Sequence, residues 1–338
     1  MNLAKGVQLM ADLMRSPRFE REALESEQQV VRGELERRAA DPDWLLSAMV
    51  DQQLWGTGWD RKNTIGNIPS IIGATPERLK QIYEQFYIPN NAAVVITGDV
   101  AAADAFALAA KHFTRWKRAG DPFANLTIPP MPPLKAHRQV TVPLEATDVT
   151  LLVRWQGPRV REDPAGAYAA DLFAAILNDP ISALQSRLLD TGLFQSVVMY
   201  SATRAHVGEI SLEAVTTADQ LVPASAALRA EVAAFAGPGY VTAEALEIAK
   251  KRQEVQWAIA MEAPSGLAHF VGELWSVAGL DYARGYLAGL KSQRVQDLQK
   301  FVATYLADRP RVTGIMLSPV TRHQLGPKLQ EALAPWRQ

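Results

Sequence analysis

The chain has 338 residues, of which 48% are hydrophobic and 21% are charged, and its formal net charge is -1 at pH 7. This near-neutral balance argues against nucleic acid or an anionic membrane surface as a partner, and no apolar run reaches the roughly 18 residues of a membrane span. The sequence contains no Cys, which excludes disulfides, thiolate zinc sites and cysteine nucleophiles. Any metal ligand must therefore be His, Asp or Glu.

In the first part of the chain, apolar spacing and helix-breaking residues predict helices over residues 2–14, 21–39, 44–54, 75–87 and 101–114. The last of these begins after a predicted short buried strand, Ala92–Thr97. The segment Thr75-Pro76-Glu77 is a typical helix start, with a capping hydroxyl, Pro in the first turn and an acid near the positive helix end. Residues 119–138 are rich in Pro and can hold neither a helix nor a central strand, so they are predicted to be a linker.

Beyond the linker, the sequence predicts a mixture of strands and helices. The predicted strands are residues 139–142, 149–155, 196–202, 210–214 and 312–317, and the predicted helices are 165–177, 182–190, 219–235, 242–260, 264–277, 280–287 and 292–306. Strict alternation of strand and helix is absent. The expected class is therefore α+β, with helices packed on one face of a mainly antiparallel sheet.

The chain also repeats itself at an offset of about 220 residues. Subtracting about 219 from six apolar positions of the last helix and strand gives six earlier apolar positions. The late positions are Leu298, Phe301, Val302, Tyr305, Leu306 and Ile315, and the early ones are Leu79, Ile82, Tyr83, Phe86, Tyr87 and Ile96. The second copy opens near Gln139, so the same arithmetic places the opening of the first roughly 80 residues before Met1.

This repeat predicts two homologous domains, of which the first is incomplete in this chain. Residues 1–118 would be the C-terminal part of the first domain, 119–138 the linker and 139–338 the second domain. Because upstream sequence is expected, the absence of a secretory signal in residues 1–20 does not determine the compartment.

The helix predicted for residues 21–39 carries two carboxylates on a stripe that it shares with apolar side chains. Glu27 and Glu34 are seven residues apart, which is almost two helical turns. Acidic side chains at inward-facing positions need a partner or a function. Either the stripe is shallow and both acids reach solvent, with Glu34 paired to Arg37 or Arg38, or the two acids are functional. The pattern alone favours the first interpretation.

Several short motifs lie on and around this helix. They are Ser16-Pro17-Arg18-Phe19, Glu27-Gln-Gln-Val-Val-Arg-Gly-Glu34-Leu35, Asp41-Pro42, Leu54-Trp55-Gly56, Ile65-Gly66, Thr75-Pro76-Glu77, Phe86-Tyr87-Ile88-Pro89-Asn90-Asn91-Ala92 and Gly98-Asp99-Val100. Together they resemble the M16 family of zinc metallopeptidases, which includes pitrilysin, insulinase and the mitochondrial processing peptidases. The resemblance spans most of residues 3–118 and, more weakly, the second repeat.

The resemblance implies duplicated α/β-roll domains and a zinc-dependent endopeptidase that encloses peptides between two halves. In that family two His and one Glu of a His-x-x-Glu-His helix supply two zinc ligands and the general base, and a downstream Glu completes the ligand set. By resemblance, Glu34 matches the downstream zinc ligand and Glu27 a supporting residue on the same helix face. The resemblance thus favours a functional role for both acids.

The sequence departs from the family at two places. It contains no His-x-x-Glu-His, which the family spacing would place roughly 75 residues before Glu34 and therefore before Met1. We expect this chain to bind no zinc and to be inactive by itself, and we expect its scattered histidines to be ordinary surface or packed residues. A family Arg and Tyr that bind substrate fall on Leu188 and Gln195, so the substrate-binding residues are unknown and this segment is expected to be structural.

The leading hypothesis is a portion of a zinc metalloendopeptidase acting on peptides or small proteins, with a second half, a second subunit or a further copy as partner. The alternative is a non-catalytic subunit or scaffold of the same fold that binds a catalytic partner or extended peptides at a sheet edge. Whether the chain is an enzyme stays open at this point. A bacterial protein of this kind would be periplasmic or cytoplasmic. No phosphate-binding loop or nucleophile elbow supports a small-molecule enzyme.

Overall fold

The computed structural model describes residues 3–337, and the chain divides into two compact units. Unit 1 comprises the described residues up to Arg37, Asn63–Pro130 and Glu262–Gly272. Unit 2 comprises Arg38–Lys62, Met131–Met261 and the described residues from Glu273 onward. Each unit therefore includes a segment from the other part of the sequence. Among the residues described, no helix combines the length and apolar character needed to cross a membrane.

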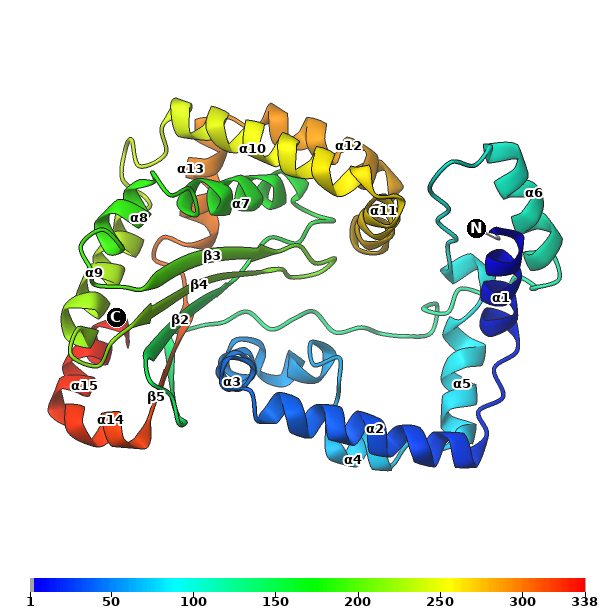
Figure 1. The fold of residues 1–338 in the computed structure, drawn as a ribbon, viewed down its shortest axis with the longest axis horizontal. Helices are drawn as coiled ribbons and strands as arrows, with labels where there is room; N and C mark the ends of the chain where they lie inside the picture. The colour runs from blue at the N-terminus through cyan, green and yellow to red at the C-terminus, as the bar shows by residue number, and fades with distance from the viewer. Residues whose placement is uncertain (1–2, 338) are drawn as a thin grey trace. The chain divides into compact units, whose positions relative to one another are not determined.

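The described part of unit 1 is built from helices (Figure 1). They are α1 (Leu3–Arg15), α2 (Arg21–Ala39, to Arg37), α4 (Ile68–Ile72), α5 (Pro76–Phe86), the short η2 (Pro89–Asn91), α6 (Ala102–Phe113) and the first part of α11 (Pro264–Ala278). The predicted start of α5 is confirmed, because the Thr75 side chain accepts a hydrogen bond from the backbone N–H of Arg78 and Pro76 occupies the first turn. Helix α1 packs against α6 and buries Val7 and Ala11.

The strand predicted at Ala92–Thr97 is not formed. Ala92 has extended backbone angles, but the segment pairs with no strand among the described residues. Its side chains are half-buried or exposed, and Val94 is exposed. A strand requires hydrogen-bonding neighbours as well as β-forming residues, and the sequence pattern reports only the latter.

Unit 2 contains a five-stranded sheet with the order β1-β5-β2-β4-β3. Its strands are β1 (Arg138–Pro143), β2 (Val149–Gln156), β3 (Ser196–Ala202), β4 (Glu209–Thr216) and β5 (Arg311–Leu317). Strands β1 and β5 are parallel, whereas the other neighbouring pairs are antiparallel. The expected combination of a mainly antiparallel sheet with packed helices is confirmed.

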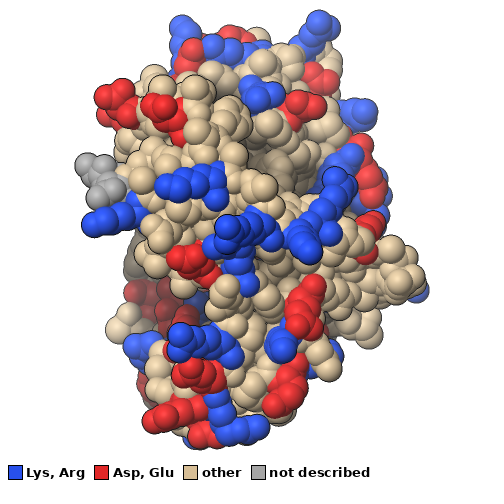
Figure 2. All heavy atoms as spheres, turned by 90° about the vertical axis from the view of Figure 1, so that its right-hand side faces the viewer, with Lys and Arg blue, Asp and Glu red and all other residues tan. Residues whose placement is uncertain are grey.

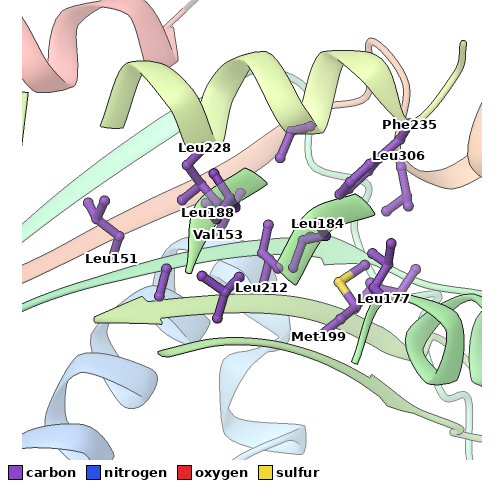
Figure 3. Packing of buried hydrophobic residues seen from close by; sticks show 14 of the residues in the cluster. Leu151, Val153, Leu177, Leu184, Leu188, Met199, Leu212, Leu228, Phe235 and Leu306 are labelled. Carbon is purple, nitrogen blue, oxygen red and sulfur yellow. The ribbon is translucent and has the colours of Figure 1, made fainter. Parts of the chain in front are cut away.

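One face of this sheet is covered by a helical layer, and the main core lies between the two. The remaining elements of unit 2 are α3 (Pro42–Trp55), η1 (Gly56–Arg61), α7 (Pro164–Leu177), α8 (Ala183–Leu188), α9 (Leu221–Ala234), α10 (Ala243–Glu262), α12 (Leu280–Ser292), α13 (Val295–Tyr305), α14 (Pro319–Leu325), α15 (Pro327–Leu333) and η3 (Ala334–Arg337). Alternate residues of β2, such as Leu151 and Val153, point into this core with Leu212 of β4 and Leu228 of α9 (Figure 3).

Two features of unit 2 differ from the sequence-based expectation. Helix α3, from before the linker, also packs on the sheet, on the opposite face against β1, β5 and β2, which the sequence did not predict. Gly314 of β5 makes this approach possible, since a Cβ atom there would lie 2.4 Å from Cγ2 of Val50. Helices α14 and α15 were not predicted, because segments this short show fewer than two helical turns of periodic pattern.

A partly buried carboxyl group lies between the sheet and its helical layer. Asp171 of α7 accepts hydrogen bonds from Ser201 Oγ at 2.5 Å and from Tyr286 OH at 2.8 Å. Burial raises the pKa of Asp171 above its ordinary value, and the two hydrogen bonds only partly oppose this rise. A raised pKa in the folded state means that folding favours the protonated acid. Asp171 therefore contributes its full stabilisation at a pH below its unfolded-state pKa of about 3.9. That contribution is lost as the pH rises through the folded-state pKa.

We therefore expect Asp171→Asn to flatten the pH dependence of stability. Asn can accept one of the two hydrogen bonds and donate the other, but it has no proton to lose. Relative to the parent chain, the variant should gain stability progressively between pH 4 and pH 7. Urea unfolding midpoints measured across this range would test the prediction, and parallel profiles for the two proteins would contradict it.

Candidate metal-ligand helix

Helix α2, which carries the two candidate acids, is rich in residues of high helix propensity, but its side chains are little buried. Between Arg21 and Ala39 the residues are mainly Glu, Gln, Arg, Leu and Ala, which have high helix propensity. An ion pair between Arg32 and Glu36, at 2.9 Å, adds support on the exposed side. None of the residues of α2 is fully buried. Local propensity thus forms this helix, and a few specific contacts orient it.

The most specific of these contacts is made by Gln28. Its Nε2 donates to the backbone carbonyl oxygens of Ile71, Ile72 and Ala74, at 2.9, 3.2 and 3.0 Å. These carbonyls lie at the end of α4, where backbone acceptors lack partners within the helix. Gln28 therefore ties α2 to the C-terminal end of α4 and fixes the rotation of α2 about its axis.

Glu27 and Glu34 lie on one side of α2, as predicted, but their surroundings differ. Their Cα atoms are about 10.5 Å apart along the axis at about 1.5 Å per residue. Glu34 is half-buried, whereas Glu27 is exposed, so Glu27 reaches solvent, as the interpretation of a shallow stripe expects. Glu27 borders an open depression of about 530 Å³ together with Arg18, Phe19 and Leu79. At this separation two ordinary carboxylates do not bind one metal ion side by side.

The described residues do not make a zinc site on their own. No group of three or more His, Asp or Glu within this part of the chain is placed to hold a metal ion. The histidines lie on or near separate elements, and the backbone N–H of Arg311 donates to His137 Nδ1 at 3.3 Å. Burial lowers the pKa of His137. A catalytic zinc site takes three protein ligands, so no catalytic step through zinc is derived from this chain alone.

A charged network that the sequence reasoning missed lies under α3 in unit 2. Arg154 of β2 donates from Nη1 to Asp51 Oδ1 at 2.6 Å and to Ser47 Oγ at 3.0 Å, and from Nε to Ser211 Oγ at 2.8 Å. Burial raises the pKa of Asp51, while the neighbouring guanidinium of Arg154 lowers it. The signal for this network was an Arg within the apolar strand Val149–Gln156. Its geometry fastens α3 to the sheet.

The segment around Leu188 and Gln195 has structural roles. Leu188 lies in the main core, and Gln195 Nε2 donates to Asp148 Oδ1 at 2.9 Å. Arg187 forms an ion pair with the buried Glu231 at 3.2 Å.

On the molecular face in Figure 2, Lys and Arg side chains are interspersed with Asp and Glu, so that face carries no extended patch of one sign.

Comparison with known families gives one match. The profile of the family described as Peptidase M16 inactive domain matches residues 73–253, more than half of the chain. Glu27 and Glu34 lie before the matched residues. A Bacillus subtilis protein named Uncharacterized zinc protease YmfH is 27% identical over 99 residues, which cover 29% of this chain and 23% of that protein. The chain thus matches about a quarter of the length of this curated relative.

Solved structures share the fold at low sequence identity. A protease from Helicobacter pylori superposes with a TM-score of 0.81 at 22% identity, covering 94% of this chain and 77% of that one. The first half of the periplasmic protease PqqL from Escherichia coli gives a TM-score of 0.69 at 17% identity, covering 100% of this chain and 75% of that chain. Against PqqL as a whole, this chain covers 39% of the length, with a TM-score of 0.70 and 16% identity.

Proposed function

The chain belongs to the family described as Peptidase M16 inactive domain, and from this premise we propose that it is a portion of a zinc-dependent metalloendopeptidase. Its substrates would be peptides or small proteins enclosed between this half and a second half or subunit of the same fold. Glu34 would serve as one zinc ligand, and Glu27 would support the site from the same helix face. The remaining ligands would come from outside these 338 residues, and the chain by itself would be inactive.

The observation that carries this proposal is the geometry of α2. Two acids lie on one side of a helix whose rotation is fixed by Gln28, and one of them, Glu34, is half-buried. Zinc ligands are usually oriented by neighbouring hydrogen-bonding groups, and a carboxylate two turns away can act through such neighbours without touching the metal. The likeness to a curated zinc protease and to the first half of a two-half protease supports the same function.

Zinc content and peptidase activity test the proposal. The chain would be compared with a form extended upstream by roughly 100 residues, using an unstructured fluorogenic peptide as substrate. We expect about one zinc per molecule and peptide cleavage in the extended form only. In that form Glu34→Gln should remove the zinc and lower kcat/KM by at least about 100-fold, and Glu27→Gln should lower it by about 10- to 100-fold.

Glu25→Gln is a suitable control for both variants. Glu25 is exposed and lies on the opposite side of α2 from Glu34, so its replacement should change neither zinc content nor activity. An extended Glu34→Gln variant that keeps its zinc would overturn the role of Glu34. The circular dichroism spectrum of Glu34→Gln should match that of the parent extended chain. An unchanged spectrum would show that the zinc is lost because a ligand is missing, and not because helix α2 is damaged.

Two observations favour a second candidate function, that of a non-catalytic subunit or scaffold. Among the described residues no group of three or more His, Asp or Glu is placed to hold a metal ion, and the matched family is described as an inactive domain. A non-catalytic subunit or scaffold that binds a catalytic partner or extended peptides would account for both facts. Edge strand β3 is the natural place for an added strand in unit 2. A metal-free and inactive extended chain would favour this second function.

A further inference from the structure

A cavity of about 340 Å³ lies in the helical layer of unit 2. Its walls come from the C-terminal end of α7, from α8 and from the N-terminal end of α10 with the loop before it, and these segments lie side by side in Figure 1. Because one water takes about 30 Å³ of liquid volume, the cavity has room for roughly ten non-hydrogen atoms. This is the size of a small ligand. No residue of the candidate metal-ligand helix lines it.

Most of the cavity wall is apolar. Ile176 of α7 is buried and Ile248 of α10 is half-buried, and both line the cavity. Ile181, in the loop before α8, also lines it and is 79% exposed. An isoleucine this exposed contributes little to the hydrophobic stabilisation of the fold, but its area would be removed from water by an apolar ligand in the cavity. The wall therefore favours a ligand with an apolar body.

A guanidinium in the cavity wall is held by a buried carboxylate. Nη1 of Arg187 donates to Oε1 and Oε2 of Glu231, at 3.4 and 3.2 Å, and the Glu231 side chain is 5% exposed. Tyr240, which also lines the cavity, donates from its OH to Glu231 Oε1 at 2.6 Å. Burial and the neighbouring Glu231 carboxylate raise the pKa of Tyr240, so its OH stays a neutral donor at physiological pH. Glu231 therefore orients both Arg187 and Tyr240.

The contact with Glu231 uses only one nitrogen of Arg187. Among the residues that the structure describes, Nε and Nη2 of this guanidinium have no hydrogen-bond partner. These two nitrogens form an edge that can bind a carboxylate through two parallel hydrogen bonds. The Arg187 side chain is 57% exposed, so a ligand can reach it from solvent. The buried carboxylate thus positions the guanidinium and leaves its bidentate edge for a second anion.

The acids that line the cavity are compensated in other ways. Asp179 Oδ1 accepts from the backbone N–H of Ile181 at 3.1 Å, and its Oδ2 forms an ion pair with Arg252 at 3.1 Å. Glu244 is exposed in the first turn of α10, where the positive end of the helix favours a negative charge. Arg187 therefore offers a ligand charged hydrogen-bond donors that the fold does not use.

From these observations we propose that the cavity binds a carboxylate with an apolar body of about five to nine carbon atoms. The carboxylate pairs with Nε and Nη2 of Arg187, and the apolar body lies against Ile176, Ile181 and Ile248. This chemistry is carried by a free monocarboxylic acid or by the C-terminal residue of a peptide. The site needs neither zinc nor Glu34, so it is independent of the proposed peptidase function.

NMR of the isoleucine δ1-methyl groups in the 338-residue chain tests the proposal. Titration with 3-phenylpropionate or 4-methylpentanoate should shift the methyl signals of Ile176, Ile181 and Ile248 and saturate with a Kd of about 0.1–1 mM. The corresponding amides have the same shape without the charge and should bind at least about tenfold more weakly. Acetate, which lacks the apolar body, should also bind at least about tenfold more weakly.

A short peptide that ends in Leu distinguishes the two sources of the carboxylate. If the free-acid peptide binds more tightly than 4-methylpentanoate and its amidated form does not, the ligand is a peptide C-terminus. If the small acids bind more tightly than the free-acid peptide, the ligand is a free acid. Either result supports the recognition of an apolar carboxylate.

Two variants connect binding to the cavity. Arg187→Lys keeps a charge that compensates Glu231 but loses the bidentate edge, so the Kd should rise by at least about tenfold. Arg284→Lys, at an exposed position of α12 outside the cavity wall, is its control and should leave the Kd unchanged. Ala183→Trp, at an exposed position in the wall, should fill the cavity and abolish the shifts. Its control is Ala226→Trp, which is exposed on α9 outside the wall.

Any of four results would overturn the proposal. The acids could shift no isoleucine signal of the cavity. The amides could bind as tightly as the acids, which would show that the carboxylate is not recognised. An amine with the same apolar body could bind more tightly than the acid, which would assign the cavity to cations near Asp179 and Glu244. Finally, Ala183→Trp could bind the acids as tightly as the parent chain, which would place their site elsewhere.

Discussion

Replacing Asp51 by Asn should lower the free energy of unfolding of unit 2 by about 3–5 kcal/mol. The Arg154 and Asp51 side chains are 9% and 17% exposed, and their charged atoms are 2.6 Å apart. Asn removes the charge that compensates Arg154, and a guanidinium cannot lose its proton to avoid the cost of burial. Urea denaturation followed by tryptophan fluorescence would measure the loss, because Trp55 and Trp155 are buried in this unit.

The reciprocal variant provides the control. In Arg154→Met the residue left behind is Asp51, whose pKa is already raised by burial, and it can become neutral by binding a proton. The cost of Arg154→Met should therefore be smaller than that of Asp51→Asn, and it should shrink as the pH falls toward 4. The double variant Asp51→Leu with Arg154→Met should recover much of the loss. Equal, pH-independent costs for the two single variants would contradict this account.

Phe301→Ala should lower the free energy of unfolding of unit 2 by about 3–5 kcal/mol, whereas Ile82→Ala should change that of unit 1 by less than about 1 kcal/mol. Phe301 lies in the main core, with its ring centroid 5.8 Å from that of Phe173, so the truncation leaves a cavity. Ile82 occupies the equivalent helix position but is exposed in this chain. Hydrogen exchange would resolve the two units separately.

The same substitutions can be compared in the chain extended upstream. If the added residues pack on α5, Ile82→Ala should lower the free energy of unfolding of that form by about 2–4 kcal/mol. Leu298→Ala serves as a matched truncation in unit 2, where its residue is buried, and its cost should be the same in both forms. A large cost of Ile82→Ala in the chain alone would show that this side of α5 is already packed.

Much of the fold could be predicted because it depends on local signals. The bounds of α2 and the cap of α5 follow from helix propensity, Thr75 and Pro76. The alternation in β2 predicts its core-facing residues, although Arg154 interrupts the apolar run on the other face. The candidate acids Glu27 and Glu34 were found from their spacing and from a family resemblance, and their metal-binding role stays a prediction.

What the sequence determined by itself is most of the helices and strands and the family resemblance, since helix caps, periodicity and motifs depend on a few residues that are near one another in the sequence. What the tertiary structure decided is which of these patterns are satisfied. Phe301 and Ile82 are matched by the sequence repeat, yet one is buried and the other exposed. Ala92–Thr97 and β5 carry similar β-forming residues, yet only β5 has neighbours. Burial and strand pairing depend on distant segments, so they are fixed by which parts of a chain meet in space.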